Sequence, residues 1–182
     1  RATTDSELIT ALLSHEPGSL LDAVCNVMPL LQGAYSIVTL TEHELVAFRD
    51  PNGVRPLVLG KLGGSYVLAS ETCAFDIIGA EFVRDLDPGE MVVINGNGLE
   101  SLKPFVGSER RFCIFEYIYF ARPDSVVEGS SVYEARKRIG AELSRESGVE
   151  ADLVIPVPDS GVPAALGFAE AAGIPFELAA TA

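Results

Sequence analysis

The sequence predicts an α+β region followed by an α/β region. In the first region, apolar residues at helical spacing give way at Ala34 to the period of two that half-buried strands show. In the last region, helix, strand, tight turn and helix follow one another, the order of a parallel α/β domain. The composition changes near 103–110, and we place the domain boundary there, which gives domains 1–107 and 108–182.

Two helices open the first region. A polar segment, 3–7, precedes apolar residues at helical spacing, so Thr4 or Asp5 marks a helix start. A second helix is expected after Pro17-Gly18-Ser19.

Antiparallel strands and tight turns follow, because period-two segments alternate with Gly, Pro and Asn. The expected strands are 34–40, 44–49, 57–59, 65–70 and 90–94, and a short helix is expected over 72–79.

The second region begins with an aromatic-rich segment, 112–120. An amphipathic helix over 133–146 leads to an apolar strand, 152–157, a turn at Pro158-Asp159-Ser160-Gly161, and an Ala-rich helix over 163–172.

The charge and the cysteines exclude several classes of protein. The net charge of −13, from 26 acids against 13 bases, repels polyanions, so we expect no nucleic-acid partner. No apolar run approaches the roughly 18 residues of a membrane span, and we expect no membrane partner. Cys25, Cys73 and Cys113 are widely spaced and odd in number, which suits the reducing cytoplasm.

Ser160 is the first candidate site residue. A Gly-containing turn between a parallel strand and a helix N-terminus presents N–H groups to a phosphate, and the Ser160 hydroxyl can join them. The alternative is a helix-capping turn with no ligand. Asp5 is open in the same way: it is either a capping residue or a carboxylate that holds an ammonium group. Cys113 is either a small buried hydrophobe or one ligand of a metal site.

The chain resembles the amidophosphoribosyltransferase family in three segments: 46–57 (VAFRDPNGVRPL), 69–76 (ASETCAFD) and 116–125 (EYIYFARPDS). The first two occur in looser form across class II glutamine amidotransferases. The third, with 157–160 (VPDS), is closer to this family, and the matches run in order along essentially the whole chain.

The resemblance implies the later half of an N-terminal-nucleophile glutaminase, an αββα sandwich, followed by the start of a type I phosphoribosyltransferase domain. Family members transfer ammonia from glutamine to Mg-bound phosphoribosyl pyrophosphate, giving phosphoribosylamine in the first step of purine synthesis. It also implies a cytoplasmic homotetramer inhibited by purine nucleotides.

The family's residue roles carry over to three positions. Asp5 matches the residue that holds the α-amino group of glutamine. Ser160 matches the hydroxyl near the Mg–pyrophosphate site. Cys113 matches the first ligand of a [4Fe-4S] cluster in one branch, although cluster-free members also have a Cys there.

The family's N-terminal nucleophilic Cys and its acidic phosphoribosyl pyrophosphate loop do not occur in this sequence. Both ends look cut, so we expect an internal fragment that is inactive alone. The alternatives are another class II amidotransferase, such as glucosamine-6-phosphate synthase or asparagine synthetase, and a non-catalytic phosphoribosyl-binding regulator.

Overall fold

The computed structural model describes residues 3–105 and 109–178. Its contacts divide the chain into two compact units, Arg1–Ser70 with Ala80–Phe112, and Glu71–Gly79 with Cys113–Ala182. The boundary predicted between 107 and 108 lies outside the described residues. The structure adds one feature that the sequence pattern did not predict: residues 71–79 belong with the second unit.

The first unit begins with helices α1 (Asp5–His15) and α2 (Leu20–Val27), as expected. Ser19 caps α2 in a capping box, in which its side chain accepts from the Asp22 N–H and the Asp22 side chain accepts from the Ser19 N–H. A short 3₁₀ turn, η1 (Met28–Leu30), follows α2.

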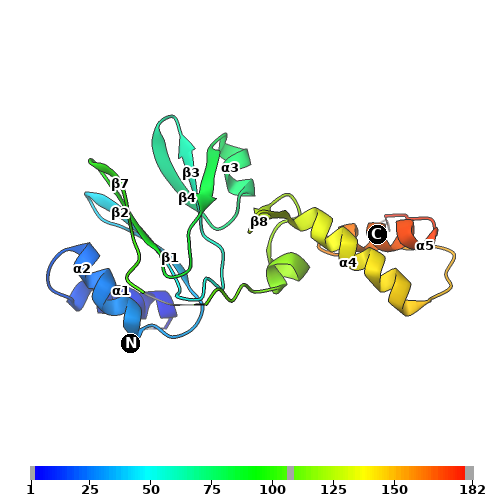
Figure 1. The fold of residues 1–182 in the computed structure, drawn as a ribbon, viewed down its shortest axis with the longest axis horizontal. Helices are drawn as coiled ribbons and strands as arrows, with labels where there is room; N and C mark the ends of the chain where they lie inside the picture. The colour runs from blue at the N-terminus through cyan, green and yellow to red at the C-terminus, as the bar shows by residue number, and fades with distance from the viewer. Residues whose placement is uncertain (1–2, 106–108, 179–182) are drawn as a thin grey trace. The chain divides into compact units, whose positions relative to one another are not determined.

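Two antiparallel sheets form the rest of the first unit (Figure 1). The strand orders are β1-β2-β6-β7 and β4-β3-β5. The strands are β1 (Ser36–Leu40), β2 (Glu44–Arg49), β3 (Val58–Leu62), β4 (Ser65–Ala69), β5 (Glu81–Asp85), β6 (Met91–Asn95) and β7 (Gly98–Leu102).

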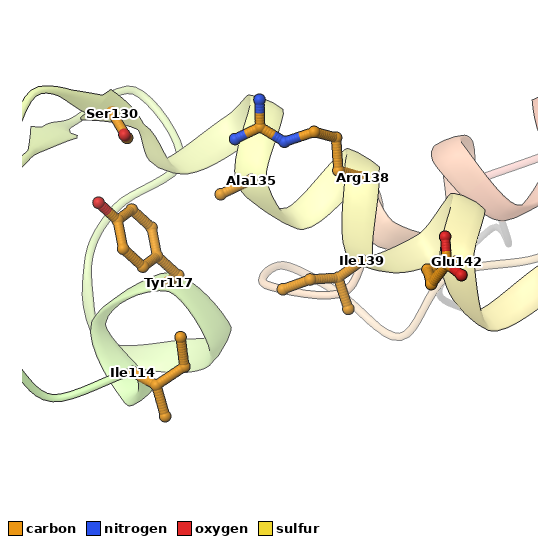
Figure 2. Close-up of a pocket in the computed structure, with 7 residues that line it drawn as sticks. All are labelled: Ile114, Tyr117, Ser130, Ala135, Arg138, Ile139 and Glu142. Atoms are coloured by element: carbon orange, nitrogen blue, oxygen red, sulfur yellow. The ribbon is translucent and has the colours of Figure 1, made fainter.

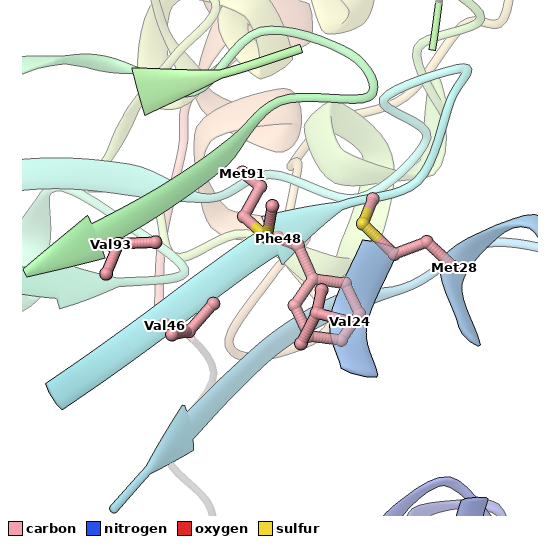
Figure 3. Packing of buried hydrophobic residues seen from close by; sticks show 6 residues of the cluster. All are labelled: Val24, Met28, Val46, Phe48, Met91 and Val93. Carbon is pink, nitrogen blue, oxygen red and sulfur yellow. The ribbon is translucent and has the colours of Figure 1, made fainter. Parts of the chain in front are cut away.

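Alternation along β2 and β6 gives the four-stranded sheet two apolar faces. One face packs against α2 and η1, and Figure 3 shows this cluster, which consists of Val24, Met28, Val46, Phe48, Met91 and Val93. On the other face, Ala47 and Val92 pack with Leu59 of β3 and with Leu57 and Leu86, which lie just outside β3 and β5. The first unit therefore contains a helical layer and two sheet layers.

Strands β5 and β7 were not predicted. Each lies at the edge of its sheet, where one side needs no partner strand. Glu81, Arg84 and Asp85 make β5 charged, which is typical of an edge strand and hides the period-two pattern.

The second unit contains two further helices, α4 (Val132–Ser147) and α5 (Val162–Ala172), which pack closely together. A Cβ added at Gly140 of α4 would lie 1.8 Å from the carbonyl oxygen of Ala164, so only glycine permits this approach. Among the described residues no helix, including the 16-residue α4, is long and apolar enough to cross a membrane.

Three short elements complete this unit: α3 (Cys73–Ile78), the π-helix η2 (Glu116–Phe120), and the hairpin of β8 (Val126–Val127) with β9 (Ser130–Ser131).

The strand predicted over 152–157 is wrong. Residues 152–157 make one isolated parallel bridge, between Val154 and Phe176, and form no regular strand. Leu153 and Ile155 are 46% and 55% exposed. A parallel strand depends on hydrogen-bonded neighbours, and the described part of the chain offers this segment only the 174–177 segment.

Candidate functional site

Asp5 is the first residue of α1, and its side chain is exposed. The capping role that the sequence left open belongs to Thr4, whose Oγ1 accepts the Glu7 N–H at 3.2 Å. Among the described residues, the Asp5 carboxylate has neither a hydrogen bond nor an ion pair. An exposed carboxylate at this position is free to bind a cationic group.

The turn after β2 is built around two buried charged residues. The Arg49 guanidinium is fully buried and donates to three backbone carbonyls, those of Arg55 at 2.7 Å, Leu86 at 2.5 Å and Gly53 at 2.8 Å. The motif residue Arg49 therefore fixes the loop that the motif encodes.

Asp50, also fully buried, holds the same turn from the other side. Its carboxylate accepts the N–H groups of Asn52 at 2.9 Å and Val54 at 3.0 Å. An aspartate whose side-chain oxygen accepts a hydrogen bond from the backbone N–H two residues later forms an Asx-turn. This family motif thus has a structural role in building the turn.

The other two motifs contact each other within the second unit. Glu71, at the start of one, accepts through Oε2 from the Arg122 N–H and from the Ser125 hydroxyl, each at 2.7 Å. Arg122 also forms a two-bond ion pair with Asp124, which lowers the pKa of the Asp124 carboxyl. Sequence reasoning singled out both motifs but gave no signal that they pair.

Ser160 lies in the predicted turn before α5 and is partly buried. The turn is closed by the Gly161 N–H, which donates to Val157 O at 3.2 Å. A Cβ at Gly161 would lie 2.6 Å from that same oxygen, so the turn requires glycine. No side-chain cap bonds the N-terminus of α5. The Val162 N–H donates to Asp159 O at 3.3 Å and Pro163 has no N–H, so only part of the first turn of α5 is open to a ligand.

A cavity of about 130 Å³ joins Ser160 to a buried arginine. Arg136 lines it with Ser160, Gly161 and three apolar residues, Ile118, Ile139 and Ala164. Arg136 is 2% exposed and donates to Tyr117 O at 2.6 Å and Ala121 O at 2.7 Å. Burial lowers the pKa of its guanidinium, and nearby Glu71 opposes that change.

Sequence reasoning missed Arg136. A signal for it was present, because Val132, Arg136 and Gly140 follow one another at a spacing of four and form the buried face of α4.

Cys113 is partly buried and lies just before η2. Its carbonyl accepts the Glu116 N–H at 3.1 Å. The three cysteines, Cys25, Cys73 and Cys113, are free thiols. Within 3–105 and 109–178 no three His, Cys, Asp or Glu side chains are grouped to hold a metal ion.

A larger groove of about 450 Å³ runs along α4, as Figure 2 shows. Ala135, Arg138, Ile139 and Glu142 line it from α4, and the Tyr117 ring faces them. The Tyr117 hydroxyl already donates to Val127 O at 2.6 Å. None of the sequence-predicted site residues lines this groove.

A family model for a glutamine amidotransferase domain matches residues 1–76. Together with the paired antiparallel sheets and their helical layer, this match defines the first part of the chain as an amidotransferase domain of mixed α/β architecture.

The similar proteins have more specific names than the family model. The chain is 46% identical over 98% of its length to the amidophosphoribosyltransferase of Bacillus subtilis (strain 168), and 50% identical over 96% to that of a Synechocystis species. A solved structure of the B. subtilis glutamine phosphoribosylpyrophosphate amidotransferase, complexed with ADP and GMP, matches 98% of the chain with a TM-score of 0.93. Over nearly its whole length the chain is therefore similar to amidophosphoribosyltransferases. It spans 38% and 36% of the length of these two relatives.

Proposed function

We propose that the complete protein containing this chain is an amidophosphoribosyltransferase. It converts glutamine, phosphoribosyl pyrophosphate and water to 5-phosphoribosylamine, glutamate and pyrophosphate, the first step of purine nucleotide synthesis. The observation that carries this proposal is the similarity to relatives of that name, which covers 95–98% of the chain and thus both of its units.

In this proposal the two units have different tasks. The first is the later half of a glutaminase domain with the αββα sandwich, of which the structure contains one helical and two sheet layers. The second is the start of a type I phosphoribosyltransferase domain. Its bridge between Val154 and Phe176 is parallel, as the strands of such an α/β domain are.

Asp5 is proposed to hold the α-amino group of glutamine. The exposed carboxylate, which α1 does not use for capping, supports this role. A carboxylate–ammonium hydrogen bond is charge-assisted and about twice as strong as a neutral one.

Ser160 is proposed to bind the phosphates of phosphoribosyl pyrophosphate. Its hydroxyl can donate to a phosphate, the start of α5 carries the positive end of a helix dipole, and the nearby Arg136 guanidinium adds positive charge. The Ser160 hydroxyl would be one oxygen ligand of Mg²⁺, because this ion takes oxygen ligands and keeps several from water and substrate phosphates. When bound, it neutralises phosphate charge, while Ser160 and the backbone orient the substrate.

A [4Fe-4S] cluster fits the described residues less well. Four thiolates hold such a cluster, and no three His, Cys, Asp or Glu side chains are grouped for a metal in the part of the chain that the structure describes. In a cluster-containing protein, Cys113 would be one ligand and the others would come from outside this chain.

The remaining elements of the proposal concern the complete protein: a cytoplasmic homotetramer that purine nucleotides inhibit. The nucleotides in the solved B. subtilis relative, ADP and GMP, support the last point. We expect the 182-residue chain alone to turn over neither substrate, because the nucleophile and the phosphoribosyl pyrophosphate loop of the family lie outside it.

The test is an assay of the purified complete protein. Glutamate and phosphoribosylamine are measured with glutamine and phosphoribosyl pyrophosphate together, with each omitted, and with ammonia replacing glutamine. We expect both products only when both substrates are present, and phosphoribosylamine alone with ammonia. Product formed from fructose 6-phosphate instead would identify a glucosamine-6-phosphate synthase. Binding of phosphoribosyl pyrophosphate without turnover would identify a regulator.

A further inference from the structure

The segment 71–79 leaves one unit, contacts the other, and returns. It follows β4, which ends at Ala69, and precedes β5, which starts at Glu81. Both strands pair with β3 in the first unit, whereas 71–79 belongs to the second. The chain therefore passes between the units at both ends of this short segment.

Side-chain hydrogen bonds hold the segment at its first two residues. Glu71 Oε2 accepts from Arg122 and Ser125, as described above, and Ser125 is only 1% exposed. Thr72 Oγ1 accepts the Val126 N–H at 2.8 Å and donates to Val126 O at 3.4 Å. We call these four bonds the clasp.

The turn that receives the clasp is fastened in its own unit. The Ser125 N–H donates to Arg122 O at 3.1 Å, and the Val132 N–H donates to Ser125 O at 3.0 Å. Arg136, from α4, holds the adjoining carbonyl of Ala121 at 2.7 Å. Hydrogen bonds thus connect α4 to the turn and the turn to Glu71 and Thr72. These two residues are joined to β4 by the polypeptide chain itself.

We propose that Glu71 and Thr72 are positioning residues through which the second unit controls the ends of β4 and β5, and that this couples glutamine hydrolysis to phosphoribosyl transfer. Only one residue, Ser70, separates the clasp from β4. A change in the 122–126 turn therefore acts on the chain just beyond the end of a paired strand of the first unit. This proposal rests on the proposed function above, because it assigns the coupling to that reaction.

The test compares Thr72→Val with Thr72→Ser in the complete protein. Valine has the shape of threonine but makes neither Oγ1 bond, whereas serine keeps the hydroxyl. The first measurement is the factor by which phosphoribosyl pyrophosphate changes the rate of glutamine hydrolysis. The second is hydrogen exchange of 65–69 and 81–85 with and without phosphoribosyl pyrophosphate.

In Thr72→Val we expect the factor to fall about fivefold or more, the lower range of a site-to-site coupling. Ammonia-dependent transfer should stay within about twofold of the parent, and the ligand-dependent change in exchange of both strands should shrink. Thr72→Ser should match the parent in every measurement. Ser125→Ala removes one hydrogen bond to Glu71 and should lower the factor by a smaller amount. If Thr72→Val does not fold, Ser125→Ala replaces it in both measurements.

Equal factors in Thr72→Val and Thr72→Ser would overturn the coupling, as would a parent in which the ligand leaves both strands unchanged. A parent that turns over neither glutamine nor phosphoribosyl pyrophosphate would instead refute the proposed function. The exchange measurement needs only ligand binding, so it separates these two failures.

Discussion

The Glu71 carboxylate accepts the backbone N–H of Arg122 at 2.7 Å, across 51 residues of sequence. The same oxygen accepts the hydroxyl of Ser125, which is almost fully buried. Removing the acceptor leaves two donors in the second unit without a partner, and an unsatisfied buried donor is costly.

Glu71→Ala should lower the stability of the second unit by about 1–3 kcal/mol. Ser125→Ala should cost less, because the Arg122 N–H keeps its acceptor. The double variant should lose less than the sum of the two single losses, since both remove the same bond. Hydrogen exchange of residues 113–135 in the complete protein measures these differences, and strict additivity would show that the two side chains do not interact.

Gly140→Ala should destabilise the α4–α5 pair strongly. The added Cβ would meet backbone atoms of Ala164, its carbonyl oxygen at 1.8 Å, and backbone cannot rotate away as a side chain can. Overpacking of this kind costs about 1–3 kcal/mol or more. Denaturant unfolding measures the loss. Gly96→Ala is the control, since a Cβ there meets nothing within 4 Å, and it should change stability by less than about 0.5 kcal/mol.

The stability of the first unit should fall in acid because of Glu90, which is 1% exposed. Burial by itself raises the pKa of Glu90, but hydrogen bonds from Arg84, Ser101 and the Asp87 N–H outweigh it, and the pKa lies below the ordinary value of 4.5. A carboxyl with a lowered pKa in the folded state stabilises the protein above its unfolded pKa. That contribution is lost as the pH falls through the folded pKa.

Unfolding free energies measured from pH 7 to pH 3 test this expectation. The parent should lose stability below about pH 4.5, the ordinary pKa of the carboxyl. Glu90→Gln should be less stable at pH 7 and should lose less on acidification. A Glu90→Gln variant with the acid sensitivity of the parent would show that other carboxyls cause it.

Asp5→Asn should raise the KM for glutamine at least about tenfold, because the variant keeps the shape but loses the charge that pairs with the α-amino group. Its ammonia-dependent activity should equal that of the parent. Thr4→Ala is the matched control: losing the cap should cost about 1 kcal/mol of stability and leave the KM unchanged. A normal KM in Asp5→Asn would remove Asp5 from the glutamine site.

Ser160→Ala should raise the KM for phosphoribosyl pyrophosphate by about tenfold, the loss of one hydrogen bond to a charged group. Ser160→Thr, which keeps the hydroxyl, should retain more of the affinity. The assay is ammonia-dependent transfer in the complete protein, so that the glutamine site has no influence. Equal KM values in the alanine variant and the parent would favour a turn that only caps α5.

Local features could be predicted because their causes lie close together in the sequence. The capping box of Ser19 and Asp22 spans three residues, and the turns at Gly63-Gly64 and Gly96-Asn97-Gly98 lie between strands that pair with each other. The helices and most strands of the first unit follow from such signals. Strand β5 did not, because its charged side chains suit an edge position that only the assembled sheet defines.

By itself, the sequence determined the main helices, most strands of the first unit and the family motifs, and it gave the candidate residues Asp5, Ser160 and Cys113. The tertiary structure alone decided that Thr4 rather than Asp5 caps α1, that Arg136 lines the cavity of Ser160, and that residues 71–79 belong with the second unit. It also replaced the strand expected over 152–157 with a single bridge. For Arg136, residues 71–79 and residues 152–157 the physical reason is the same: their partners are distant in sequence and are chosen by packing, which the pattern of one segment does not reveal. The cap of α1 is local, and it depends on which of two neighbouring polar residues precedes the first helical residue.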